Sequence, residues 1–314
     1  MKKAEALQFY LNPRRSDHFP LNWEKEFGRS APLGLEIGCG NGEYLAAWAA
    51  ARPEWNLVGI ELAFASIDRI TKRLLKLENP SARVLLMDAR FAVRELFPDN
   101  SLDYIIMNFP DPWPKEKHKQ RRLLDPDFIK TLSVVLKPGA VYELVTDQEW
   151  YARDAAEFFR NSNLFEVKEI ELDPRRPVTT KYERKWLAEG RHTYRLLAVK
   201  KEAAAVQRIL EEGEMPHFII QKPPEESSLK KLKGLVFKDA EKVVTIKDVY
   251  LEPENGTALL RTVAADKDYS QNFFMLVAPH EAGSIVKLDQ TMQPFRTPAV
   301  KMAVKVVGEF LKEN

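Results

Sequence analysis

The chain contains 314 residues, of which 45% are hydrophobic and 30% are charged, and this balance excludes an intrinsically disordered protein. The 48 Lys and Arg residues nearly equal the 46 Asp and Glu residues, so the net charge of +2 leaves nucleic-acid binding to a local patch. The single cysteine excludes an intramolecular disulfide and a cysteine-based zinc site. Because no apolar run approaches roughly 18 residues and the first residues do not resemble a secretion signal, we expect a cytoplasmic protein with no membrane span and no metal.

Short apolar runs alternate with helical patterns between residues 33 and 200. This alternation predicts a doubly wound, Rossmann-like α/β sheet with mainly parallel strands and helices on both faces. Such sheets bind ligands at the carboxyl ends of their strands. The expected strands are Leu33–Ile37, Leu57–Ile60, Val84–Met87, Tyr104–Met107 and Ala140–Thr146, with Phe165–Leu172 and Thr193–Lys200 at one edge. The expected helices are Tyr44–Ala51, Ala65–Glu78, Ala89–Leu96, Pro126–Leu136 and Gln148–Asn161.

The pattern changes after this first domain, which we place at residues 1–202. Residues 203–228 are predicted to form a helical segment and a linker, because Lys222–Ser228 is rich in proline and polar residues. Residues 229–314 are predicted to form a small α+β domain of unknown role. Its expected elements are the strands Val243–Leu251, Ala258–Val263 and Phe273–Ala278, a hairpin turn at Pro253-Glu254-Asn255-Gly256, and a helix from Pro298 with Val300, Val304, Val307 and Leu311 on one face.

A glycine loop at residues 38–42 follows the first strand, with Gly38, Gly40 and Gly42 at alternate positions. Glycines let the backbone turn tightly and approach a ligand closely. The spacing is G-x-G-x-G rather than the G-x-G-x-x-G of dinucleotide loops, and the nearby carboxylate of Glu36 would repel a pyrophosphate. The loop therefore favours a cationic, hydroxyl-rich ligand such as S-adenosyl-L-methionine.

Acidic residues also follow the next two expected strands. Glu61 stands where a carboxylate can bind a ribose diol, and Asp88 stands where one can accept a hydrogen bond from an adenine amino group. The alternative is that each residue merely caps the helix that follows it, a position that acidic residues favour. Glu36, Glu61 and Asp88 each lie at or just after the end of one of the first three expected strands, and this arrangement favours nucleoside binding.

The fourth strand ends in a proline-rich segment, Asn108-Phe109-Pro110-Asp111-Pro112-Trp113-Pro114, which we call the elbow (residues 108–114). Prolines fix the backbone dihedral φ, so a stiff turn is expected. A stiff turn opposite a cofactor loop is suited to positioning a reacting group, with Asp111 at its centre. Trp113 has the alternative interpretation of a core or interface aromatic residue.

Five of the next eight residues, Lys115 to Arg122, are positively charged, and we call this segment the basic ribbon (residues 115–122). Lysines and arginines neutralise phosphates, so the ribbon favours contact with a polyanion. A basic segment on a surface is often only solvated, and that alternative remains open. A second and weaker basic cluster includes Arg175 and Arg176.

Further polar groups follow the later strands. Asp147 ends the fifth expected strand, which places another carboxylate at the same edge of the sheet. Glu183 has an acceptor for the N–H donors of a purine. It closes the segment Thr180-Lys181-Tyr182-Glu183.

Together, the motifs EIGCGNG, GIE, MDA, NFPDPWPKEKHKQRR, VTD and TKYERK resemble the tRNA (guanine-N7-)-methyltransferases of the bacterial TrmB type. The resemblance covers roughly residues 5–200 and leaves residues 203–314 as an unexplained extension. It implies cofactor contacts at Glu36, Gly38, Gly40, Gly42, Glu61, Asp88 and Asp111, and substrate contacts at Lys115, Asp147, Thr180, Lys181, Tyr182 and Glu183. It implies tRNA contacts at Lys117, His118, Lys119, Gln120, Arg121 and Arg122. Gln120 departs from the family pattern, which more often has a basic residue there.

The resemblance implies methyl transfer to N7 of a guanosine in the tRNA variable loop, conventionally position 46. N7 carries a free lone pair and no hydrogen, so no general base is needed, and the sequence shows no obvious nucleophile–base pair. We assign Asp111 as the catalytic residue that stabilises the developing positive charge.

Other functions remain possible from the residues alone. A methyltransferase acting on a small molecule or a protein would share the cofactor half and would not need the basic ribbon. A non-catalytic RNA-binding protein would need no intact acids at the strand ends. The loop spacing and Glu36 disfavour a nicotinamide dehydrogenase.

Overall fold

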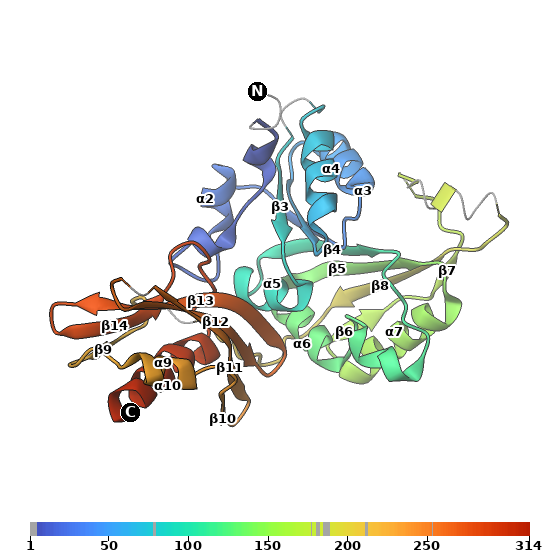
Figure 1. Cartoon of the computed structure of the whole chain (residues 1–314). Helices are drawn as coiled ribbons and strands as arrows, with labels where there is room; N and C mark the ends of the chain where they lie inside the picture. Colours follow the sequence, from blue (N-terminus) through green and yellow to red (C-terminus); the bar gives the residue numbers. More distant parts are fainter. Residues whose placement is uncertain are drawn as a thin grey trace. The chain divides into compact units, whose positions relative to one another are not determined.

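The computed structural model describes residues 5–77, 80–176, 178–179, 183–184, 189–210, 213–252 and 254–314. The chain divides into two compact units, and each is treated by itself (Figure 1). Unit 1 contains residues 1–13 and 20–207, and unit 2 contains residues 14–19 and 208–314. In the described ranges, no helix is both long and apolar enough to cross a membrane.

Unit 1 is built on a sheet in which the strand order is β3-β2-β1-β4-β5-β8-β6, with β7 also paired with β8. Strands β1 to β5 run parallel to one another, and β8 runs antiparallel to β5. The bounds are β1 Leu33–Ile37, β2 Asn56–Glu61, β3 Ala82–Leu86, β4 Leu102–Asn108, β5 Leu136–Thr146, β6 Phe165–Val167, β7 Glu171–Leu172 and β8 Tyr194–Lys200. This topology confirms the predicted Rossmann-like class, and chain order reverses between β1 and β4, where such sheets bind ligands.

Helices α3 to α7 of unit 1 form two rows. Right-handed connections that lead towards opposite edges of a sheet place their helices on opposite faces. α3 lies beside α4 in one row, and α5, α6 and α7 are successive neighbours in the other. The bounds are α2 Trp23–Phe27, α3 Glu43–Ala51, α4 Phe64–Leu74, α5 Ala89–Leu96, α6 Pro126–Val135 and α7 Glu149–Ser162, with short 3₁₀ turns η1 Leu7–Phe9, η2 Pro13–Arg15 and η3 Glu116–Arg121. All five residues of β1 are buried, as expected for a central strand covered on both faces.

In its described residues, unit 2 is an antiparallel sheet of strand order β10-β11-β12-β13-β14-β9 with two α-helices. The strands are β9 His217–Ile220, β10 Val236–Asp239, β11 Lys242–Glu252, β12 Thr257–Asp266, β13 Tyr269–His280 and β14 Gly283–Leu288, and the helices are α9 Glu226–Lys231 and α10 Pro298–Glu313. The predicted hairpin joins β11 to β12, and Gly256 has a φ of 69° that suits glycine. Pro253 lies outside the described residues. α10 buries Val300, Val304, Val307 and Leu311 in the core, as predicted.

Three features differ from the sequence expectation. The helical segment expected from residue 203 is wrong for residues 203–210 and 213–216, which form no helix. There the backbone N–H of Ala204 donates to Ser133 Oγ at 3.0 Å, so a tertiary contact replaces a helical bond. The expected strand Phe165–Leu172 is two short strands, β6 and β7. Residues 14–19 belong to unit 2, where Phe19 packs edge-on against Phe295 at 5.7 Å between ring centroids.

Candidate active site

A cavity of about 310 Å³ opens at the carboxyl ends of β1 and β4. Its position matches the ligand site expected where the strand order of a doubly wound sheet reverses. The walls come from the end of β1, the glycine loop, the start of α3 and the elbow. The lining residues are Glu36, Gly38, Cys39, Gly40, Asn41, Glu43, Tyr44, Asn108, Phe109 and Asp111.

The glycine loop adopts a backbone that side chains would strain. Gly38, Gly40 and Gly42 have φ values of 74°, 53° and 69°. A Cβ atom at Gly38 or Gly40 would meet nothing within 4 Å, so these two positions are open, whereas one at Gly42 would lie 2.9 Å from Ile70. The loop thus combines an open cradle beside the cavity with a close fit against α4.

Glu61 holds the glycine loop from the end of β2. Its Oε2 accepts a hydrogen bond from the Gly40 N–H at 2.8 Å. Its Oε1 accepts from the N–H groups of Leu62 and Ala63 at 2.8 and 2.9 Å. The carboxylate therefore has a structural role that the sequence pattern did not indicate, and ribose binding by Glu61 stays a prediction.

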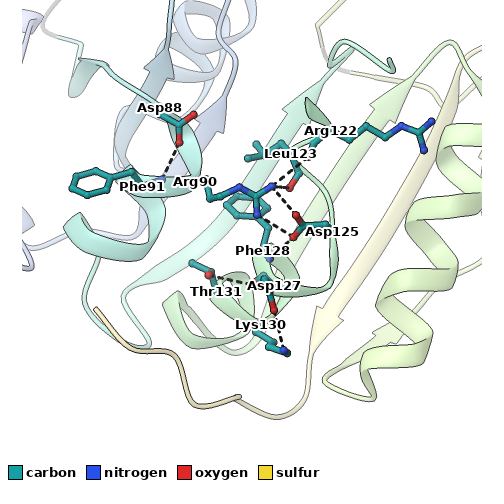
Figure 2. Close-up of polar contacts among 10 residues, drawn as sticks. All are labelled: Asp88, Arg90, Phe91, Arg122, Leu123, Asp125, Asp127, Phe128, Lys130 and Thr131. Carbon is teal, nitrogen blue, oxygen red and sulfur yellow. Dashed lines mark hydrogen bonds and ion pairs between the residues drawn. The ribbon is translucent and has the colours of Figure 1, made fainter. Parts of the chain in front are cut away.

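Asp88 caps α5, the alternative considered for it from the sequence. Its Oδ1 accepts from the Phe91 N–H at 3.0 Å, and the remaining side chain is exposed (Figure 2). Capping satisfies one of the free N–H groups at the start of a helix. The adenine contact expected of Asp88 stays a prediction.

Glu36 is the most unusual group of the cavity, because only 2% of the residue is exposed. Its Oε1 accepts from Asn108 Nδ2 at 3.2 Å, while its Oε2 is buried and has no hydrogen-bond partner among the described residues. Burial raises the pKa of Glu36 to about 8, and the Asn108 amide and the charge of Arg176 offset this only in part. A buried, incompletely paired carboxyl group is costly unless a ligand satisfies it.

Arg176 connects the end of β4 to a residue expected to bind substrate. Its Nη1 lies 2.9 Å from Glu183 Oε2, and its Nη2 donates to Asn108 Oδ1. Its guanidinium also stacks over the rings of Tyr44 and Phe109 at 5.2 and 5.8 Å. Only 2% of the Arg176 side chain is exposed. The sequence placed this residue in a weak basic cluster, because burial of an arginine leaves no local signal.

The elbow is strained as well as rich in proline. Phe109 and Trp113 have positive φ values of 48° and 44°, which are uncommon for aromatic residues, and each precedes a proline. The Phe109 N–H donates to the Val145 carbonyl at 2.7 Å, and the Trp113 carbonyl accepts from Nε and Nη2 of Arg122 at 3.3 and 3.1 Å. Tertiary bonds therefore hold a backbone that costs on the order of 1–3 kcal/mol per strained residue. Asp111 is exposed at the cavity wall.

The basic ribbon contains two kinds of cation. Lys115, Lys117 and Arg121 are exposed, whereas Arg122 is only 7% exposed. The guanidinium of Arg122 lies 4.8 Å from the Trp150 ring centroid, and its Nη1 lies 3.4 Å from Asp154 Oδ2. Arg122 therefore anchors the ribbon, and the tRNA contact expected for it stays a prediction.

The remaining residues of the ribbon and the elbow pack beside one another. Arg121 stacks over the Trp113 ring at 4.9 Å, and the His118 ring meets the same indole edge-on at 5.7 Å. Gln120 is exposed, and the side chain of Lys119 lies outside the described part. Trp113 is half-buried and packs against the ribbon, so it is an interface aromatic between elbow and ribbon rather than a core residue.

The structure brings some of the expected residues together and leaves others apart. Within the described ranges, the cavity lining contains Glu36, Gly38, Gly40 and Asp111. It does not contain Gly42, Glu61, Asp88, Lys115, Asp147 or Glu183. Asp147 accepts from Gln148 Nε2 at 2.8 Å and lies 3.8 Å from Arg191 Nη1. Thr180, Lys181 and Tyr182 lie outside the described residues.

The chain is similar to known methyltransferases. A family model described as a putative methyltransferase matches residues 30–196. A tRNA (guanine-N(7)-)-methyltransferase of Thermotoga maritima is 38% identical over 306 residues, 97% of either chain, and one of Thermus thermophilus is 32% identical over 96% of either chain. An enzyme of the same name from Geobacter metallireducens is 35% identical over 59% of this chain and 90% of its own. The extension is therefore shared with some relatives, a point that motifs of the first domain did not reveal.

Proposed function

Because the chain belongs to the tRNA (guanine-N(7)-)-methyltransferase family, we propose that it transfers a methyl group from S-adenosyl-L-methionine to N7 of a guanosine in the tRNA variable loop. The observation that carries this proposal is the buried carboxyl group of Glu36, whose Oε2 has no hydrogen-bond partner in the described part of the chain, beside an open glycine cradle. A site with that chemistry accepts a cation and disfavours a phosphate.

The residues present fit S-adenosyl-L-methionine. Glu36 would pair with a cationic group, and Gly38 and Gly40 leave open space for a close approach of the ligand to the backbone. Glu61 keeps the loop in this shape through its bond to the Gly40 N–H. Asp88 stands at the end of β3, in line with the predicted adenine contact.

S-adenosyl-L-methionine supplies a methyl group on a positively charged sulfur. The guanine N7 has an in-plane lone pair and no hydrogen, so the protein does not need to remove a proton. Methylation places a positive charge on the purine, and a carboxylate nearby stabilises that charge. Asp111 is the described acidic residue of the elbow that lines the cavity, and we assign it this part.

The elbow and the basic ribbon bind the tRNA substrate in this proposal. A guanine within folded RNA must leave its stack before its N7 can enter the cavity. The exposed cations Lys117 and Arg121 would bind phosphates beside the target nucleotide and keep it there. Arg176 would hold Glu183 in place to receive the N–H donors of the guanine.

Methyl transfer to unmodified tRNA tests this proposal directly. The protein is incubated with the methyl-labelled cofactor and tRNA, and the product is mapped by chemical cleavage at 7-methylguanosine. Label at one variable-loop guanosine is expected. Label in small molecules or protein, with none in tRNA, would favour the alternative methyltransferase, and no cofactor binding by calorimetry would favour a non-catalytic RNA-binding protein.

A further inference from the structure

Arg90 lies on α5, two residues after the helix cap Asp88, and its guanidinium reaches across to the segment that follows the basic ribbon (Figure 2). Its Nη2 donates to the backbone carbonyls of Arg122 and Leu123 at 3.3 and 3.0 Å. The same guanidinium pairs with Asp125, through Nη1 to Oδ1 at 3.0 Å and Nη2 to Oδ2 at 2.8 Å. One side chain therefore binds two adjacent backbone carbonyls and a carboxylate.

Asp125 is itself a structural element of this region. Its Oδ1 accepts from the Phe128 N–H at 2.8 Å and so caps α6, which begins at Pro126. The Arg90 guanidinium lies 5.7 Å from the Phe128 ring centroid, and the Phe128 side chain is fully buried. Arg90 thus meets an ordered helix start and a buried ring on one side and the end of the ribbon on the other.

The two ends of the ribbon are held by different arginines. Figure 2 shows the Arg122 side chain extending away from Arg90, although its carbonyl accepts a bond from Arg90. The Arg122 guanidinium returns to the Trp113 carbonyl in the elbow. The segment from Trp113 to Leu123 is consequently a closed loop, tied to the elbow through Arg122 and to α5 through Arg90.

We infer that Arg90 is a positioning residue for the RNA-binding ribbon, which it locks to the helix that starts at the cofactor side of the sheet. This inference rests on the proposed function, because it concerns how tRNA is held. A loop that is ordered before binding loses less conformational entropy when it binds, and its affinity rises accordingly. The geometry requires an arginine, since a lysine ammonium cannot present a planar fork to two carbonyls and a carboxylate.

On this account, the positive charge of Arg90 interacts with groups of the protein and not with an RNA phosphate. Its side chain is 21% exposed and faces Asp125 and the carbonyl groups. A phosphate contact adds its own increment to the salt dependence of binding, whereas a positioning residue does not. Salt dependence therefore separates the two roles.

The experiment compares wild-type protein with Arg90→Lys, Arg90→Met and Asp125→Asn. Asn retains helix capping, so Asp125→Asn removes the ion pair with little loss of the cap. The control is Arg153→Lys on α7, where Arg153 forms an exposed ion pair with Glu149 at 3.0 Å between Nε and Oε1. Each protein is assayed for cofactor affinity, for KM and kcat with tRNA, for the salt slope of tRNA binding, and for amide exchange of residues 115–123.

For Arg90→Lys we expect a KM for tRNA about five- to tenfold higher, a kcat within about threefold, unchanged cofactor affinity and an unchanged salt slope. Arg90→Met should have a larger effect, and amide exchange in the ribbon should accelerate in both variants. Asp125→Asn should show the same pattern more weakly, and combining it with Arg90→Lys should cost less than the sum, because both changes break one network.

Three results would overturn the inference. Wild-type affinity in Arg90→Lys with a loss only in Arg90→Met would assign the effect to charge. A lower thermal midpoint with unchanged KM would assign Arg90 to helix packing alone, and a salt slope smaller by about one in Arg90→Met, which lacks the charge, would make it a phosphate contact. If wild-type protein itself does not methylate tRNA, the proposed function fails, and amide exchange still reports whether Arg90 orders the ribbon.

Discussion

The end of β1 and the end of β4 border one cavity, and they carry their ionisable side chains in different surroundings. Glu36 at the end of β1 is 2% exposed and keeps one oxygen without a described partner, while Asp111 and the first cations of the ribbon beyond β4 are exposed. A buried carboxyl group that ionises when a cation binds interacts strongly with that ligand and is screened little by salt, whereas exposed charges act together and are screened readily. The comparison teaches that one site can bind a small cation through a buried carboxyl group and a polyanion through exposed positive charges.

The largest expected effect concerns catalysis at the β4 side. Asp111→Ala should lower kcat about 100-fold or more, on the order of 3 kcal/mol in transition-state stabilisation, because no other described acidic residue of the elbow lines the cavity. Single-turnover methylation measures this, and cofactor affinity should stay within about threefold. A loss of less than about threefold in turnover would remove Asp111 from the catalytic role.

A substitution at the β1 side of the cavity is expected to lower cofactor affinity rather than turnover. Glu36→Gln removes the carboxyl group that would release its proton and pair with the cationic cofactor, so cofactor affinity should fall by about tenfold or more. Affinity measured by calorimetry checks this, with Glu43→Gln as a control at a lining carboxylate that pairs with Arg73 instead, at 3.6 Å. Equal losses in both variants would show that overall negative charge, and not the buried group, attracts the cofactor.

Glu36 also predicts how stability depends on pH. Its folded-state pKa of about 8 lies above the unfolded value of 4.5, so the folded protein retains a proton that the unfolded chain releases. Stability contributed by this group is therefore full below pH 4.5 and is lost as pH rises towards 8. Denaturation of Glu36→Gln should show a gain over wild-type protein that grows by a few kcal/mol across this window. A constant difference between the two proteins would contradict the raised pKa.

Binding at the ribbon should depend on salt much more strongly than cofactor binding at the buried side. Replacing Lys117 and Arg121 with alanine should weaken tRNA binding about tenfold and reduce the slope of log affinity against log salt by about 1.5, since two phosphate contacts are lost. Lys72→Ala with Lys130→Ala is the matched control, because both lysines form exposed ion pairs on helices. An unchanged slope in the ribbon variant would show that these cations do not contact phosphates.

The smallest effect compares two glycines with the same φ of 69° in different units. Gly42→Ala places a Cβ atom 2.9 Å from Ile70, whereas Gly256→Ala meets nothing within 4 Å. Both substitutions should cost about 1 kcal/mol through the positive φ, and Gly42→Ala should cost about 1–2 kcal/mol more through the clash. Thermal unfolding of the two variants measures the difference. Equal losses would show that α4 yields to the extra methyl group.

The sequence predicts elements better than it predicts partners. The strands of unit 1 stand out because continuous apolar runs such as Leu33–Ile37 are needed by a strand covered on both faces. The burial of Arg122 and Arg176 could not be predicted from the sequence. Charged residues are expected at the surface until their partners Asp154 and Glu183 are known. The assignment of residues 14–19 to unit 2 rests on contacts with residues near 295, far away in the chain.

The most direct test of the account measures both ligands of wild-type protein across one salt series. If burial holds the cofactor and exposed cations hold the RNA, raising salt from about 50 to 200 mM should change cofactor affinity by less than about twofold and lower tRNA affinity about tenfold or more. A parallel decline of the two affinities, or a tRNA affinity that does not change with salt, would contradict the account.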